Sequence, residues 1–208
     1  MSKKSALTWR VNDIVVASVL AVACALIFWL WSNFGYSAIT TTLALAPEYS
    51  PLAGGVWLLA GLLGALVIRK PGAALYTEIL AAVIEALLGT HYNFTVVISG
   101  LVQGLGAELI FLIFFYKVWN LATAMLAGLA SGAAMGISEI IIYYAGEMVG
   151  QKAVIYVLCS MISGLVLAGL VSWLLVRGLV STGALDSLAA GRAARRPSRR
   201  GGPASSKG

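Results

Sequence analysis

The sequence predicts an all-α membrane protein, a single bundle of six transmembrane helices. Of its 208 residues, 60% are hydrophobic and only 11% are charged. Its apolar runs approach the roughly twenty residues that a helix needs to cross a bilayer. The net charge of +6 does not imply a nucleic-acid partner, because six of the 14 Lys and Arg residues lie in the C-terminal tail after residue 190. Such a tail is typical of a cytoplasmic end near anionic lipid, so the bilayer is the expected partner.

Polar, basic or aromatic residues mark the ends of the apolar runs. The six predicted spans are Ile14 to Phe34, Pro51 to Ile68, Gly72 to Gly89, Phe94 to Tyr116, Val118 to Ala145 and Ala153 to Val176. The first is long enough to span and has no clear cleavage site after it, so it is expected to remain in the mature protein. Gly35 to Ser50 has no Lys or Arg and is expected either to dip into the protein or to lie across its outer face.

The basic residues predict the orientation. With a cytoplasmic N-terminus, Lys152 is the only Lys or Arg that falls outside, and the positive-inside rule holds at every other loop. Both termini are therefore predicted to be cytoplasmic. Residues 1–13 form the N-terminal segment, 14–177 the membrane domain, and 178–208 a basic tail expected to be disordered.

Small residues recur at four-residue spacing in four of the spans. These stripes are Ala17, Ala21 and Ala25; Gly100 and Gly104; Gly128, Gly132 and Gly136; and Ser160, Gly164 and Ala168. This spacing puts small side chains on one helix face and lets helices approach closely. Packing within the chain is the simplest role for each stripe.

Four acidic residues lie within predicted spans, where no Lys or Arg shares their depth. They are Glu78, Glu85, Glu108 and Glu139. Carboxylates at membrane depth are costly, and such side chains normally face a protein interior or a watery cavity. Without a basic partner they must be protonated, hydrogen-bonded, or neutralised by a ligand that arrives from outside. A cationic or amine-bearing ligand is the simplest candidate.

The helical rise brings several polar residues to the outer half of the bundle. A substrate-binding pocket is predicted there, lined by Glu85, Gln103, Glu139 and Tyr143 and capped by His91, Tyr92 and Asn93. Aromatic faces beside carboxylates suit a flat cationic ring. Glu78, Glu108 and Trp57 are further candidates, although the two acids could instead bond between helices and the indole could serve as packing or an interfacial anchor.

Several functional classes lack their motifs in this sequence. It has no phosphate-binding P-loop, no HExxH, no Cys and His cluster and no Ser-His-Asp set, the only His being His91. We therefore expect no enzyme activity, no catalytic residue, no metal and no cofactor. Cys24 and Cys159 lie within apolar runs and are expected to be small buried side chains.

Three blocks of sequence carry a resemblance to a known family. They are WRVNDIVVASVLAV (9–22), PGAALYTEILAAVIEALLGT (71–90) and GLVQGLGAELIF (100–111). Together with six short spans and buried acids, they resemble the YkoE family of substrate-binding (S) components of energy-coupling factor (ECF) transporters. The resemblance covers roughly residues 9–177 and excludes the basic tail.

The resemblance implies the function. An S component would capture thiamine, or its hydroxymethylpyrimidine (HMP) precursor, from outside and work with a transmembrane coupling (T) protein and two cytoplasmic ATPases in the cell membrane. By the same analogy, Ala17, Ala21 and Ala25 would form the A-x-x-x-A face that docks the coupling protein. Two alternatives stay open: an autonomous secondary transporter that uses the intramembrane glutamates, and a structural or assembly protein that binds no small molecule.

Overall fold

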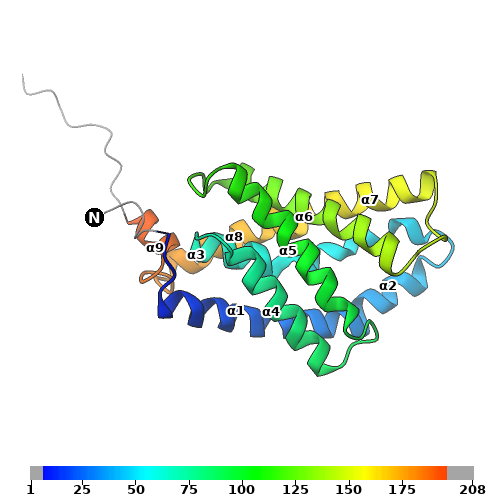
Figure 1. The fold of residues 1–208 in the computed structure, drawn as a ribbon, viewed down its shortest axis with the longest axis horizontal. Coiled ribbons are helices and arrows are strands. Elements are labelled where there is room, and N and C mark those ends of the chain that lie inside the picture. Colours follow the sequence, from blue (N-terminus) through cyan, green and yellow to red (C-terminus); the bar gives the residue numbers. More distant parts are fainter. Residues whose placement is uncertain (1–6, 196–208) are drawn as a thin grey trace, which may run out of the picture.

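The computed structural model describes residues 7–195, and within this range the chain is helical, with turns between the helices and no strand. Most helices run along the long axis of the molecule (Figure 1). In chain order the elements are α1 (Val11–Leu30), the π-helical turn η2 (Trp31–Gly35), α2 (Tyr36–Thr42), the 3₁₀ segment η3 (Pro47–Leu58), α3 (Leu59–Ile68), α4 (Ala73–Leu88), α5 (Thr95–Ile113), α6 (Leu121–Ile142), α7 (Gln151–Ser163), the π-helical η4 (Gly164–Leu170), α8 (Val171–Ser181) and α9 (Ala189–Ala194).

Five helical stretches in the described residues are long and apolar enough to cross a membrane. They are Val11–Thr42, Pro47–Ile68, Thr95–Ile113, Leu121–Ile142 and Gln151–Ser181. The remaining predicted span coincides with α4, which has 16 residues. At about 1.5 Å per residue α4 is roughly 24 Å long, less than the thickness of the hydrocarbon core. Left-handed Gly72 and the positive-φ Gly89 terminate it at its two ends.

The first helix is longer than the sequence predicted. The segment 35–50 was expected to leave the helix after Phe34, whereas α1, η2 and α2 run on without interruption to Thr42. The threonine hydroxyls of α2 are satisfied inside the helix: Thr41 donates to the Ser37 carbonyl and Thr42 to the Ala38 carbonyl, at 2.8 and 2.9 Å. Internal bonds of this kind make a Thr-rich stretch compatible with an apolar setting.

The C-terminal region contains helix beyond residue 178, where the predicted basic tail begins. The expected disordered tail was to begin at residue 178, but α8 continues to Ser181 and α9 follows. Arg195 forms an exposed ion pair with Asp186 beside α9. The rest of the predicted tail, residues 196–208, lies outside the described residues, as do residues 1–6 of the N-terminal segment.

The glycine stripes of α5 and α6 pack helices together, as predicted. A Cβ built on Gly100 would lie 2.6 Å from Ala82 Cβ in α4, and one on Gly132 would lie 2.3 Å from the Ser160 carbonyl oxygen in α7. The stripe of α6 therefore faces the stripe that begins at Ser160. Ser160 also donates a hydrogen bond to the Gly132 carbonyl at 2.5 Å. Such close approach compensates for the weak hydrophobic drive between helices in lipid.

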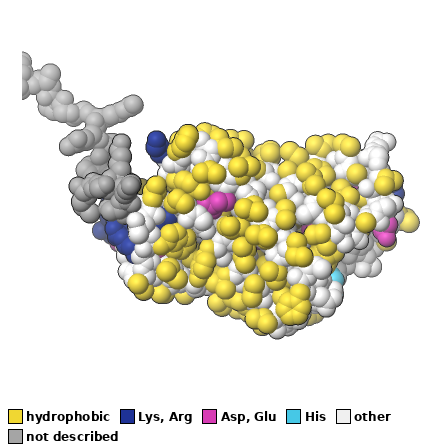
Figure 2. Space-filling view, in the orientation of Figure 1, with side chains coloured by type: hydrophobic (Ala, Val, Ile, Leu, Met, Phe, Trp, Pro, Cys, Tyr) yellow, Lys and Arg dark blue, Asp and Glu magenta, His cyan; other side chains and the backbone are white. Residues whose placement is uncertain are grey.

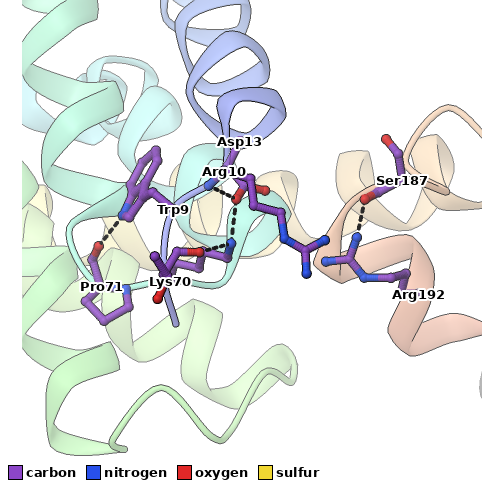
Figure 3. Close-up of polar contacts among 8 residues, drawn as sticks. Trp9, Arg10, Asp13, Lys70, Pro71, Ser187 and Arg192 are labelled. Carbon is purple, nitrogen blue, oxygen red and sulfur yellow. Dashed lines mark hydrogen bonds and ion pairs between the residues drawn. The ribbon is translucent and has the colours of Figure 1, made fainter. Parts of the chain in front are cut away.

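A buried ion pair fixes the start of α1 to the turn between α3 and α4 (Figure 3). Lys70 Nζ lies 2.5 Å from Asp13 Oδ2, and the two side chains are 3% and 2% exposed. Lys70 also donates to the Thr8 carbonyl, and the Trp9 indole donates to the Pro71 carbonyl at 2.9 Å. α9 lies at the same end of the bundle, where Lys and Arg side chains gather, while yellow apolar side chains cover the flank (Figure 2).

Candidate binding cavity

A cavity lies among the helices and is lined by most of the predicted pocket residues. It is lined by Phe28, Trp57, Glu78, Ala82, Glu85, Tyr92, Val96, Ser99, Gln103, Glu139 and Tyr143. Seven of the ten predicted substrate-binding residues are in this set. They come from η3, α4, α5, α6 and the turns that follow α4 and α6, so the site depends on the packed bundle rather than on one segment.

Two buried carboxylates face the cavity with unsatisfied oxygens. Glu78 and Glu85 are 1% and 0% exposed, and among the described residues Glu78 Oε1 and Glu85 Oε2 have no hydrogen-bond partner. Seven residues apart on α4, they share one helix face. A buried carboxylate oxygen without a donor is costly, so a ligand that donates hydrogen bonds or carries positive charge would be stabilised here.

The other oxygen of each carboxylate is held in place. The Gly61 backbone N–H donates to Glu78 Oε2 at 2.5 Å. Ser32 Oγ donates to Glu85 Oε1 at 2.5 Å and in turn accepts from Trp57 Nε1 at 3.0 Å. The indole and the serine thus orient Glu85. Sequence reasoning missed Ser32, because a single serine in the π-helical turn carries no pattern of its own.

Glu139 and Gln103 complete the polar part of the lining. The Tyr156 hydroxyl, fully buried in α7, donates to Glu139 Oε2 at 2.8 Å. Gln103 contributes its side chain to the wall, while its backbone carbonyl accepts from Ser131 Oγ at 2.8 Å. These hydrogen bonds join α6 to α7 and α5 to α6, and so hold both residues within the bundle.

Aromatic rings form another part of the wall. Trp57 meets Tyr92 edge to face with centroids 6.0 Å apart, and Tyr92 meets Tyr143 at 5.3 Å. The Tyr143 hydroxyl is within hydrogen-bond distance of Thr95 and Ser99, at 3.0 and 3.1 Å. Rigid rings beside unpaired carboxylates favour a flat, cationic or amine-bearing guest.

His91 and Asn93, predicted to cap the pocket, lie in the turn beside it and not in its lining. The His91 ring packs against Tyr92 with centroids 3.9 Å apart, and partial burial lowers the pKa of His91. Partial burial therefore disfavours the charged imidazolium beside the cavity. Asn93 has a left-handed φ of 53° and donates to the His91 carbonyl, so its role is to shape the turn.

Glu108 serves as a helix cap in the structure, away from the cavity. Its carboxylate accepts from the backbone N–H groups of Gly72 and Ala74 at 2.5 and 3.0 Å and from the Tyr116 hydroxyl at 2.6 Å. It thereby satisfies free donors at the N-terminus of α4, where negative charge is also favoured by the helix dipole. This accounts for a buried acid that sequence reasoning placed among the substrate-binding candidates.

We expect Glu108→Gln to destabilise the protein by about 1–2 kcal/mol, since it removes the charge of a helix cap. Ligand affinity should be unchanged, because Glu108 does not line the cavity. Thermal unfolding and a ligand titration on the same purified sample measure both quantities. A clear loss of affinity at unchanged stability would return Glu108 to the binding site.

The alanine stripe of α1, predicted to dock the coupling protein, is buried within the bundle. Ala17, Ala21 and Ala25 are each 0% exposed, on the face of α1 that packs against α4 and α3. Side chains without exposed surface do not offer a docking face, so the stripe serves packing inside the bundle. The exposed face of α1 carries larger residues instead, among them Val15 and Val19.

Comparisons with known proteins agree with this architecture. The family described as "ABC-type cobalt transport system, permease component" matches residues 12–134. The Bacillus subtilis (strain 168) protein named as an HMP/thiamine permease, YkoE, is 36% identical over 190 residues, which cover 89% of this chain and 92% of the relative. A crystal structure of an S component of an ECF transporter superposes with a TM-score of 0.84 at 34% identity, covering 90% of this chain and 93% of that one.

The matching family is described as a cobalt transport system, so we searched the structure for a metal site. Within residues 7–195, no three or more His, Cys, Asp or Glu side chains are grouped so as to hold a metal ion. The S-component relatives are transport proteins, not enzymes. Together with the five apolar spans of this chain, they identify it as a multi-pass protein of the plasma membrane. The chain belongs to the YkoE family of ECF-transporter S components.

Proposed function

We propose that the chain captures thiamine, or its HMP precursor, from outside the cell in the cavity between α4 and the aromatic wall. The observation that carries this is the pair of unpaired carboxylate oxygens, on Glu78 and Glu85, in a cavity that Trp57 and Tyr92 also line. A thiazolium ring is a fixed cation, and an aminopyrimidine offers N–H donors to a carboxylate. The name of the B. subtilis relative supports the same substrates.

The chain would act as one component of a larger transporter. It has no P-loop with which to use ATP, and it is similar to an S component. We therefore propose that a transmembrane coupling protein and two cytoplasmic ATPases drive release to the inside. Both termini lie on the cytoplasmic side in this scheme, with the end that carries α9 facing the cytoplasm.

We expect the purified chain to bind thiamine or HMP saturably in detergent and yet to catalyse no flux of either compound when reconstituted alone in liposomes. Tryptophan fluorescence reports binding, because Trp57 lines the cavity, and entrapment of radiolabelled thiamine reports flux. Choline serves as the control ligand, since it is cationic but has no ring. Sustained flux without partners would contradict the S-component mechanism and support an autonomous carrier.

A further inference from the structure

A second cavity opens at the end of the bundle that carries α9. It is open to the surface and is lined by Arg69, Trp119, Trp173, Val176, Arg177, Val180, Ser181, Ala190, Ala193 and Ala194. These residues come from the turn after α3, the turn before α6, α8 and α9. The cavity shares no residue with the candidate substrate site.

Two guanidinium groups line this cavity, and no acidic side chain does. The ion pairs in residues 7–195 are Lys70 with Asp13 and Arg195 with Asp186, so neither lining arginine has a carboxylate partner there. Arg69 uses its Nε to donate to the Leu66 carbonyl at 3.1 Å, which leaves both terminal nitrogens for another acceptor. Partial burial without an anion nearby lowers the pKa of Arg69.

The walls between the arginines are apolar and aromatic. Arg69 lies over the Trp119 ring at 5.8 Å, and that ring stacks on Phe111 with centroids 4.8 Å apart. Trp173 is half-buried on α8, and α9 contributes three alanines. The cavity thus combines an anion-binding fork with flat surfaces, at an end where basic side chains meet the apolar flank (Figure 2).

We propose that this cavity binds a phosphate group attached to an apolar body, held by Arg69 and Arg177. Two sources share this chemistry: the headgroup of an anionic phospholipid and a soluble phosphorylated compound. The arginines would donate to the phosphate oxygens, the indoles would cover the attached group, and the ligand would supply the negative charge that the cavity lacks. This assignment is independent of the substrate proposed for the first cavity.

The test measures three dissociation constants by calorimetry in neutral detergent. The probes are short-chain phosphatidylglycerol, short-chain phosphatidylcholine and inorganic pyrophosphate, titrated into the full chain. The variants are Arg69→Gln and Arg177→Gln, with Lys117→Gln as the matched control. Lys117 is an exposed cation in the turn before α6, contacts Phe115 and does not line the cavity.

We expect phosphatidylglycerol or pyrophosphate to bind wild type and Lys117→Gln equally, and each arginine variant at least tenfold more weakly. Tight binding of phosphatidylglycerol alone identifies a lipid headgroup; binding of pyrophosphate identifies a soluble phosphate compound. The proposal is overturned if neither anion binds, or if the anion that binds wild type binds both arginine variants equally well. The latter result, with reduced thermal stability, would mean that the arginines only complement the carbonyls at the helix ends. Arg177 is exposed, so its variant keeps the test valid if Arg69→Gln does not fold.

Discussion

Replacing Glu85 with glutamine is expected to weaken thiamine binding by about 2–3 kcal/mol, roughly 30- to 150-fold. The change removes the charge but keeps an oxygen that can accept from Ser32, which bonds Glu85 at 2.5 Å. Packing and the Trp57–Ser32 contact should survive, so thermal stability should change little. The measurement is a fluorescence titration of both proteins with thiamine and with HMP.

The two ligands separate charge from hydrogen bonding at this site. If Glu85 stabilises the thiazolium cation, affinity for thiamine falls much further than affinity for HMP, which lacks that ring. A similar loss for both ligands means that the carboxylate accepts hydrogen bonds from the shared aminopyrimidine.

The matched control for this experiment is Glu147→Gln. Glu147 is an exposed acid in the turn between α6 and α7, outside the cavity. It should bind both ligands as wild type does. If affinity is also unchanged in Glu85→Gln, Glu85 does not bind the substrate. Its Oε2, which has no hydrogen-bond partner, is then left without a functional explanation.

Much of the cavity could be predicted from the sequence because charge in an apolar helix is a strong signal. Glu78, Glu85 and Glu139 stand out against lipid-compatible neighbours, and the structure brings all three to one cavity. Glu108 gave the same signal and is a helix cap, because sequence alone does not reveal which backbone N–H groups a distant helix presents. The presence of buried carboxylates in the bundle was predictable; the contact partner of each was not.

Ser32 and the alanine stripe mark where pattern reasoning fails for a different reason. Ser32 reaches Glu85 from a π-helical turn, and the extra residue in such a turn changes which side chains face inward. Small residues at four-residue spacing predict a close helix contact but not its partner. The stripes of α5 and α6 and that of α1 carry the same spacing, and all pack within the chain.

Gly128→Val, in the glycine stripe of α6, is the substitution from which we expect the largest loss of stability. A Cβ on Gly128 would lie 2.2 Å from the Gly164 carbonyl oxygen and 2.8 Å from the Gly169 nitrogen. These are backbone atoms of η4, which cannot rotate away as a side chain can. We expect a loss of about 3 kcal/mol or more, which lowers the melting temperature by roughly 6–12 °C for a chain of this size.

Gly178→Val is the matched control, because a Cβ at Gly178 would meet nothing within 4 Å. Its melting temperature should stay close to that of wild type. Equal losses in the two variants would contradict the close contact of α6 with η4.

The contact of α6 with η4 also bears on the binding cavity, because α6 carries Glu139. The hydrogen bond from Tyr156 to Glu139, at 2.8 Å, joins α6 to α7. If Gly128→Val displaces α6 from its neighbours, it should weaken ligand binding as well, whereas Gly178→Val should leave binding intact. That result would show that the packing of α6 is required by the cavity and not only by the fold.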